Sequence, residues 1–123
     1  SFVFEGDVCN NIEISSLCEF NQDYLDELFD KNEKITKERA ISPNGSNLSL
    51  GQRQRISILR LLSLKYNPFC IILDEALSGL DEKLEVIVLD ALKRRFTDTI
   101  FIIVSHRAST LSMCNHVFTI DNS

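Results

Sequence analysis

The sequence predicts an α/β fold built around a parallel sheet. Two apolar runs of strand length, FCIIL (69–73) and TIFIIV (99–104), are flanked by segments with helical periodicity. Strands that alternate with helices are typical of a parallel sheet, and uninterrupted apolar runs predict strands that are buried on both faces. A hydrophobic fraction of 44% in 123 residues fits a folded core, at the size of one compact domain or part of a larger one.

The first part of the sequence predicts an irregular segment and then one helix. Residues 2–14 (FVFEGDVCNNIEI) mix aromatic and β-branched residues with turn formers, so we expect a short extended or irregular segment. Over residues 18–31, apolar side chains recur at helical spacing with acidic residues on the opposite face, which predicts a helix. The polar stretch 32–47 contains Pro-Asn-Gly at 43–45, which indicates a turn.

The second part predicts helices around the two strands. A helix is expected over residues 51–64, stopped by the Asn-Pro pair at 67–68. Another is expected over about 81–96, where acidic residues come first and basic residues last, as the helix dipole favours. A short helix at 107–113 and a final strand, VFTI (117–120), complete the prediction.

Charge and cysteine content narrow the classes of function. The net charge of −5 argues against broad nucleic-acid binding, which needs a basic surface. The longest apolar runs are far too short to span a bilayer. The four cysteines are widely spaced and form no CxxC pair, so we expect reduced thiols of a cytosolic protein rather than a disulfide or zinc site.

The stretch NLSLGQRQR (47–55) has the features of an anion-binding helix start. Ser49 followed by Gln52 is a capping box, which begins a helix whatever the function. Gly51 in the first turn would let a ligand approach the backbone closely. Because helix N-termini favour phosphate through their amides and dipole, this start could receive one.

Acidic and imidazole side chains follow the two predicted strands. Asp74 and Glu75 stand at the carboxyl end of the first strand, the edge where open α/β sheets bind ligands. Asp74 could hold Mg²⁺, which prefers hard oxygen ligands, and Glu75 could orient and deprotonate a water. His106, after the second strand, could donate to a phosphate oxygen. The alternative is two solvated acids and a histidine bonded to a backbone carbonyl; His116 is interpreted as structural.

Taken together, these stretches resemble a known family. NLSLGQRQR, FCIILDE, LSGLD and IVSHR are similar to the signature motif, Walker B strand, D-loop and H-loop of an ATP-binding-cassette nucleotide-binding domain, in the family's order. The opening FVFEGDVCNNI resembles the segment after the Q-loop of exporters. The resemblance covers nearly the whole chain and implies a partial P-loop NTPase (RecA-like) sheet with a helical signature subdomain. Residues 1–66 would hold the post-Q-loop segment, helical subdomain and signature helix, and 67–123 the Walker B strand, D-loop, H-loop and final strand.

The resemblance also implies roles for single residues. Asp74 would be the magnesium carboxylate, Glu75 the catalytic base and His106 the switch histidine. The signature would contact the γ-phosphate of ATP held by an opposing domain, and the D-loop would cross the dimer interface; the residues implied are Ser49, Gly51 and Gln52 in the signature, and Ser78, Gly79, Leu80 and Asp81 in the D-loop. Arg53 and Arg55 are expected to support the helix rather than touch nucleotide.

The sequence departs from the family pattern at two places. The signature carries two adjacent glycines in the family, whereas Leu50 replaces the first here. Its side chain would either crowd the phosphate or point away, which puts efficient hydrolysis at this half-site in question. The preceding stretch ISPNGSN also lacks the acidic-basic pair of many exporters.

The 123 residues contain no phosphate-binding P-loop. That loop needs GxxxxGK[ST], but the glycines stand at 6, 45, 51 and 79, and none precedes a lysine. We therefore expect the sequence to be the portion of the domain that begins after the Q-loop, and to be inactive alone. Without the P-loop strand, TIFIIV would expose a sheet edge, so self-association is also expected.

The resemblance implies a function for the parent protein. Its domain would hydrolyse ATP with Mg²⁺ between two facing nucleotide-binding domains, at the cytoplasmic face of a membrane, and drive transmembrane domains that export a substrate. One alternative is the C-terminal lobe of an SMC-like DNA-repair ATPase, which the acidic charge and the lack of heptads before Asn47 disfavour. Another is a degenerate cassette kept for docking, which only Leu50 favours.

Overall fold

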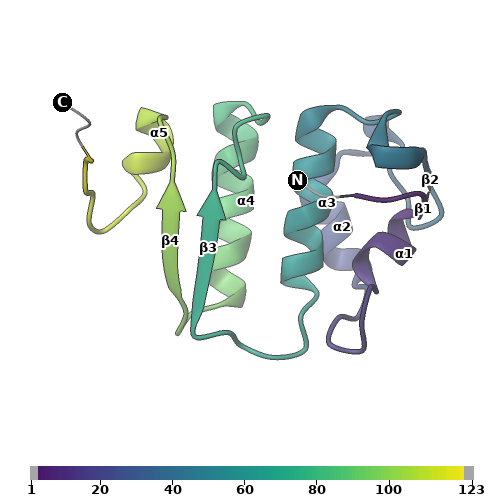
Figure 1. The fold of residues 1–123 in the computed structure, drawn as a ribbon, viewed down its shortest axis with the longest axis horizontal. Helices are drawn as coiled ribbons and strands as arrows, with labels where there is room; N and C mark the ends of the chain where they lie inside the picture. The colour runs from purple at the N-terminus through teal and green to yellow at the C-terminus, as the bar shows by residue number, and fades with distance from the viewer. Residues whose placement is uncertain (1–2, 121–123) are drawn as a thin grey trace.

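The computed structural model describes residues 3–120 (Figure 1). Two small sheets and several helices follow one another along the chain. In order they are β1 (Gly6–Asp7), α1 (Val8–Ile12), α2 (Gln22–Leu28), the 3₁₀ turn η1 (Lys31–Glu33), β2 (Ala40–Ile41), the 3₁₀ turn η2 (Pro43–Gly45), α3 (Leu50–Leu62), β3 (Cys70–Asp74), α4 (Glu82–Arg95), β4 (Ile100–Val104) and α5 (Ala108–Leu111). The α/β class predicted from the sequence is confirmed.

The central sheet consists of β3 and β4, which pair in parallel. The register runs from Cys70 opposite Ile100 to Asp74 opposite Val104. Helix α4 connects the two strands and lies behind them in Figure 1. On that side Ile71 and Leu73 are buried in the same hydrophobic cluster as Leu92 of α4. The predicted parallel pairing and the connecting helix are therefore confirmed, whereas a RecA-like sheet stays a prediction.

Helix α3 forms the centre of the other half of the molecule. Its apolar face buries Ile56, Leu59 and Leu62 completely or nearly so. Helices α1 and α2 pack against it, and β1 pairs with β2 as a short antiparallel ribbon beside them (Figure 1). The helix runs antiparallel to β3, so its first turn lies at the end of the molecule where β3 finishes.

The prediction of two buried sheet faces was wrong for the described residues. Ile72 is 67% exposed, and Ile100, Ile102 and Val104 on the same face are each about half exposed. Helix α4 covers one face, and no element within residues 3–120 covers the other. A continuous apolar run predicts two buried faces, but it does not say which chain segment would cover each of them.

The final strand at 117–120 is also not formed. These residues have no regular structure, and Val117, Phe118 and Ile120 are exposed. A strand needs a neighbour for its backbone hydrogen bonds, and in the described part of the chain β3 and β4 pair only with each other.

Two N-terminal predictions need correction. The helix predicted over 18–31 is limited to α2, because Asn21 caps it and Cys18 is held in a bridge to Leu64. The segment predicted as extended or irregular contains α1, started by a capping box between Asp7 and Asn10; Phe2 of that segment lies outside the described residues. Short helices carry too few periodic positions to be separated from turns, so local caps decide their bounds.

Candidate functional site

The ends of four secondary-structure elements lie together at one end of the molecule. The first turn of α3, the carboxyl ends of β3 and β4, and the first turn of α4 all lie at the top of the view in Figure 1. The predicted site residues belong to these ends or to the loops beside them: Ser49, Gly51, Gln52, Asp74, Glu75, Ser78, Gly79, Asp81 and His106. The fold therefore brings the sequence-predicted set to one edge of the structure.

The helix start at Ser49 is organised by reciprocal hydrogen bonds. The Ser49 hydroxyl accepts from the Gln52 backbone N–H at 3.1 Å, and Gln52 Oε1 accepts from the Ser49 N–H at 3.0 Å. This is the capping box predicted from the sequence. Both side chains are therefore engaged at the helix start, while the 13 residues of α3 direct the positive end of their dipole to the same place.

The first turn of α3 touches the loop that follows β3. A Cβ atom on Gly51 would lie 2.7 Å from the Gly79 carbonyl oxygen, so only glycine permits this approach. Leu50, the departure from the family pattern, lies against the same loop, with its Cγ 2.8 Å from where a Gly79 Cβ would be. Its side chain is half exposed and directed at Gly79.

Gln54, which the sequence analysis did not select, connects the same two elements. Its side chain is buried and bonds to three groups of the β3–α4 loop, which belong to Glu75, Ser78 and Gly79. One feature of the sequence could have identified Gln54 as part of the site: it stands three residues after Gly51 and hence on the same helix face.

Glu75 and His106 lie side by side at the sheet edge. His106 Nε2 is 3.2 Å from Glu75 Oε1, with the imidazole 93% exposed and the carboxylate 40% exposed. The Glu75 N–H donates to the Val104 carbonyl at 3.0 Å, which extends the β3–β4 pairing by one residue. Glu75 has a φ of 54°, a left-handed conformation that is costly for a residue other than glycine and recurs at functional sites. The predicted neighbourhood of these two side chains is thus present.

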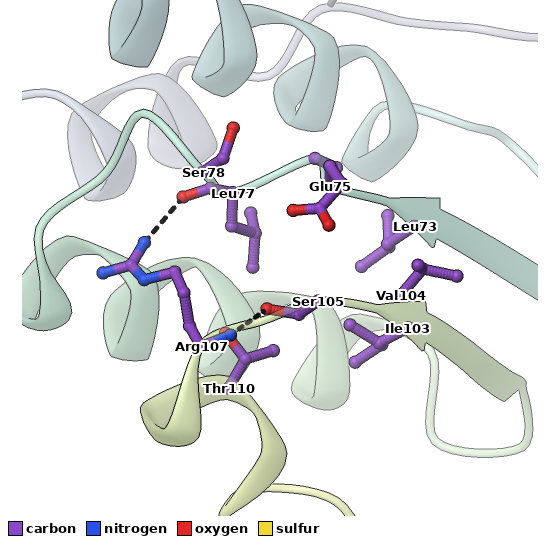
Figure 2. Close-up of a pocket in the computed structure, with 10 residues that line it drawn as sticks. Leu73, Glu75, Leu77, Ser78, Ile103, Val104, Ser105, Arg107 and Thr110 are labelled. Carbon is purple, nitrogen blue, oxygen red and sulfur yellow. Dashed lines mark hydrogen bonds between the residues drawn. The ribbon is translucent and has the colours of Figure 1, made fainter. Parts of the chain in front are cut away.

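Arg107, also missed from the sequence, fixes the loop after β3 to the loop after β4. Its Nη1 donates to the Leu77 carbonyl at 2.9 Å (Figure 2). The same atom donates to the Leu80 carbonyl at 2.6 Å and lies 3.1 Å from Glu85 Oε2. Glu85 is fully buried on α4. The sequence shows that Arg107 directly follows His106 and that Glu85 stands at helical spacing from Asp81. It contains no pattern that indicates contact between Arg107 and Glu85.

The pocket between these loops is small. Figure 2 shows Leu73, Leu77, Ile103 and Thr110 turned toward it, with the Glu75 carboxylate at its edge. About 10 Å³ of it is open to water, which is roughly room for one water molecule. A nucleotide therefore does not fit inside it.

The remaining predicted residues occupy defined places. Asp74 is exposed at the last position of β3. Asp81 caps α4 by accepting from the Leu84 N–H at 2.8 Å, and Ser78 accepts from Gln54. Within residues 3–120 no group of three or more acidic, histidine or cysteine side chains could enclose a metal. Asp74 could be a single protein ligand of Mg²⁺, an ion that keeps several waters and is bound through one or two carboxylates and phosphates.

Arg55 supports α3 as expected. Its guanidinium is buried, pairs with both oxygens of Glu33 at 2.6 and 2.8 Å, and donates to the Leu28 carbonyl at 2.9 Å. The hydrogen bonds from Arg55 hold the pKa of Glu33 below its ordinary value, although burial opposes them. Arg53 donates to the carbonyls of Gly45 and Leu48. Both arginines thus secure the segment before the helix.

The cysteines take no part in this site. All four are free thiols. Burial, followed by the hydrogen bond to Glu13, raises the pKa of Cys9 to about 11, so this thiol is a poor nucleophile at neutral pH.

Comparison with curated proteins finds transporters. The chain is 34% identical over 128 aligned residues to an ATP-dependent lipid A-core flippase of Pseudoalteromonas translucida, covering 98% of this chain and 22% of the flippase. It is 42% identical over 81 residues to ABC transporter B family member 29, chloroplastic, of Arabidopsis thaliana, covering 66% of this chain and 12% of that protein. It is 38% identical over 102 residues to multidrug resistance protein 1 of Plasmodium falciparum, covering 81% of this chain and 7% of that protein. The chain thus spans less than a quarter of each of these relatives.

A solved structure has the same fold. A structure described as a bacterial Atm1-family ABC exporter with ATP bound superposes with a TM-score of 0.73 at 24% identity, covering 91% of this chain and 21% of that one. No protein-family model matches the chain. Within residues 3–120 no helix has the length and apolar character needed to cross a bilayer.

Proposed function

The chain belongs to the ATP-binding-cassette (ABC) transporter family, and on that premise we propose that it forms the signature and Walker B part of an exporter's ATP-hydrolysing domain. The observation that carries this proposal is the pair at the sheet edge: Glu75 and His106, on loops that follow neighbouring parallel strands, lie 3.2 Å apart. The sequence of the lipid A-core flippase, which aligns over 98% of this chain, supports it.

In the proposed site each side chain has one task. The Glu75 carboxylate accepts the proton of the water that attacks the γ-phosphate of ATP, while the bond to the ADP leaving group breaks. His106 Nε2 donates to a phosphate oxygen, which the 93% exposure of its side chain allows. The exposed Asp74 carboxylate would hold Mg²⁺, whose chemistry is to neutralise charge on the phosphates.

The start of α3 would contact a second nucleotide, different from the one on which Glu75 acts. These 123 residues contain no GxxxxGK[ST] loop, so the phosphate that meets Ser49, Gly51 and Gln52 would be carried by a P-loop on a facing domain. Ser78, Gly79 and Asp81, in the exposed loop beside this helix start, would line the boundary between the two domains. The small volume of the pocket beside Glu75 supports a nucleotide site that segments beyond the described residues complete.

The proposal extends to the assembly. The strands β3 and β4 would belong to a wider RecA-like parallel sheet, with residues 1–66 as the helical signature part and 67–123 as the Walker B and H-loop part. Partners would be a second nucleotide-binding domain and transmembrane domains, placing the chain at the cytoplasmic face of a membrane. The exposed apolar face of β3 and β4 supports a missing sheet layer and a tendency of the chain alone to self-associate.

Leu50 bears on the alternative of a non-catalytic docking cassette. Its side chain is directed at Gly79 rather than lying free over the helix start, which supports a packing role compatible with catalysis. The alternative of a DNA-repair ATPase gains no support from the relatives described above, which are transporters.

Hydrolysis of Mg-ATP by the assembly that supplies the P-loop tests the proposal. We expect activity in the wild type and a loss of about 100-fold or more in Glu75→Gln. Glu82→Gln, an exposed acid in the first turn of α4, is the matched control and should keep full activity. An inactive wild-type assembly, or an active Glu75→Gln variant, would contradict the proposal.

A further inference from the structure

Gln54 is the buried polar side chain that joins the start of α3 to the loop after β3. It is only 4% exposed. Its Oε1 accepts from the Gly79 N–H at 2.7 Å, and its Nε2 donates to Ser78 Oγ at 3.0 Å and to the Glu75 carbonyl at 3.3 Å. One side-chain amide thus uses its acceptor and donors within a single loop.

The three partners belong to the turn that presents the Glu75 carboxylate. Glu75 has a left-handed φ of 54°, a conformation that persists only where its surroundings hold it. Its N–H is fixed by the Val104 carbonyl and its own carbonyl by Gln54. The peptide groups on both sides of Glu75 are therefore restrained, one by β4 and the other by α3.

The preceding helix turn carries the residues that would face phosphate. Gly51 lies one turn before Gln54 and in contact with Gly79, so the helix start and the loop are locked at two points. We propose that Gln54 is a positioning residue that holds the Glu75 carboxylate in register with the Ser49–Gln52 start of α3. The inference rests on the proposed function, and under it one chain links two nucleotides, because the helix start faces the partner's ATP and Glu75 acts on its own.

The chemistry explains why an amide is needed. An acceptor is required by the Gly79 N–H and donors by the Glu75 carbonyl and Ser78. A glutamate of the same shape would lose the donors and bury a charge, and an alanine would leave all three groups without this partner. Either change frees the Glu75 turn without touching a group that would contact nucleotide.

Steady-state hydrolysis by the complete P-loop-containing assembly tests the inference. For Gln54→Ala and Gln54→Glu we expect kcat to fall about 10- to 100-fold, since a misplacement of about 1 Å can cost that much. The KM for ATP should stay within about twofold, because the nucleotide contacts are retained. Ser57→Ala, one turn further along α3, is the control and should match the wild type.

Ser78→Ala covers the case in which neither Gln54 variant folds. It deletes one of the three hydrogen bonds, and kcat should fall by about two- to tenfold at unchanged KM. The inference is overturned if the folded Gln54 variants keep wild-type kcat, if kcat and KM change together, or if Ser78→Ala, used in their place, leaves kcat unchanged. An inactive wild type would instead overturn the proposed function, since that result precedes any effect of Gln54.

Discussion

Gly51 and Gly79 lie in direct backbone contact. A Cβ on Gly51 would approach the Gly79 carbonyl oxygen to 2.7 Å, and a Cβ on Gly79 would approach the Gly51 amide nitrogen to 2.9 Å. One glycine belongs to the start of α3 and the other to the loop after β3, so the absence of two side chains sets the spacing between them. The residues assigned to the helix start and to the sheet edge can therefore share one surface.

Substitution at this contact should separate the two elements. Gly79→Ala would force its methyl group against the Gly51 backbone, and we expect a loss of about 1–3 kcal/mol in the free energy of unfolding. Urea denaturation measures it. Ser46→Ala, an exposed position in the turn before α3, is the control. An unchanged midpoint for Gly79→Ala would show that the contact is not tight.

The Arg107–Glu85 pair should be strongly coupled. Arg107→Gln would leave the fully buried Glu85 carboxylate without its cation, which we expect to cost about 3–5 kcal/mol of unfolding free energy. The double change Glu85→Gln with Arg107→Gln should cost less than the single Arg107 change. Arg94→Gln removes an arginine whose contacts to Glu27 and Asp90 are half exposed, so it should cost under about 1 kcal/mol. Equal effects of the two single arginine changes would refute the coupling.

The Glu33–Arg55 pair gives the fold a pH dependence. The pKa of Glu33 is held below its ordinary value chiefly by hydrogen bonds from Arg55. The carboxylate form therefore stabilises the folded state at pH values above the ordinary pKa of glutamate, and this contribution is lost as the pH falls through the lowered value.

Unfolding free energies of the wild type and Glu33→Gln, measured from neutral to acidic pH, test this. The wild type should lose stability more steeply on acidification than Glu33→Gln. Glu38→Gln, an exposed acid with a 4.0 Å contact to Lys37, should follow the wild type. Parallel curves for the wild type and Glu33→Gln would contradict the assignment.

The uncovered sheet face should make the chain self-associate. Ile72, Ile100, Ile102 and Val104 expose contiguous apolar surface on β3 and β4. We expect sedimentation velocity at tens of micromolar to show species larger than a monomer, and Ile102→Lys to shift the distribution toward the monomer. Thr97→Lys, an exposed change after α4, should not. A monodisperse wild-type monomer would count against this expectation.

The sequence correctly predicted those helices whose periodicity or capping residues lie within the helix itself. The periodicity of α3 and α4 and the capping box at Ser49 are present as predicted. The strand at 117–120 and the second buried face of β3 were wrong because both depend on a neighbour that residues 3–120 do not supply. Helix α1 was missed because a five-residue helix is decided by its cap, not by periodicity.

In the candidate site, too, some contacts could be predicted from the sequence and others could not. The proximity of Glu75 and His106 followed from strand ends that share a sheet edge, which a pattern can reveal. Gln54 and Arg107 were missed because their partners are backbone carbonyls, an amide and a buried acid on other elements. Long-range hydrogen bonds of this kind leave no periodic trace in a sequence.

We propose above all that this chain receives phosphate only across an interface with a P-loop-bearing domain. Calorimetric titration of Mg-ATP into the 123-residue chain, taken to millimolar nucleotide, tests this most directly. We predict no heat of binding from the chain alone, and saturable heat once a P-loop-bearing partner is present. Saturable binding by the chain alone, lost in Ser49→Ala or Glu75→Gln, would mean that these residues build a complete nucleotide site and would contradict the claim.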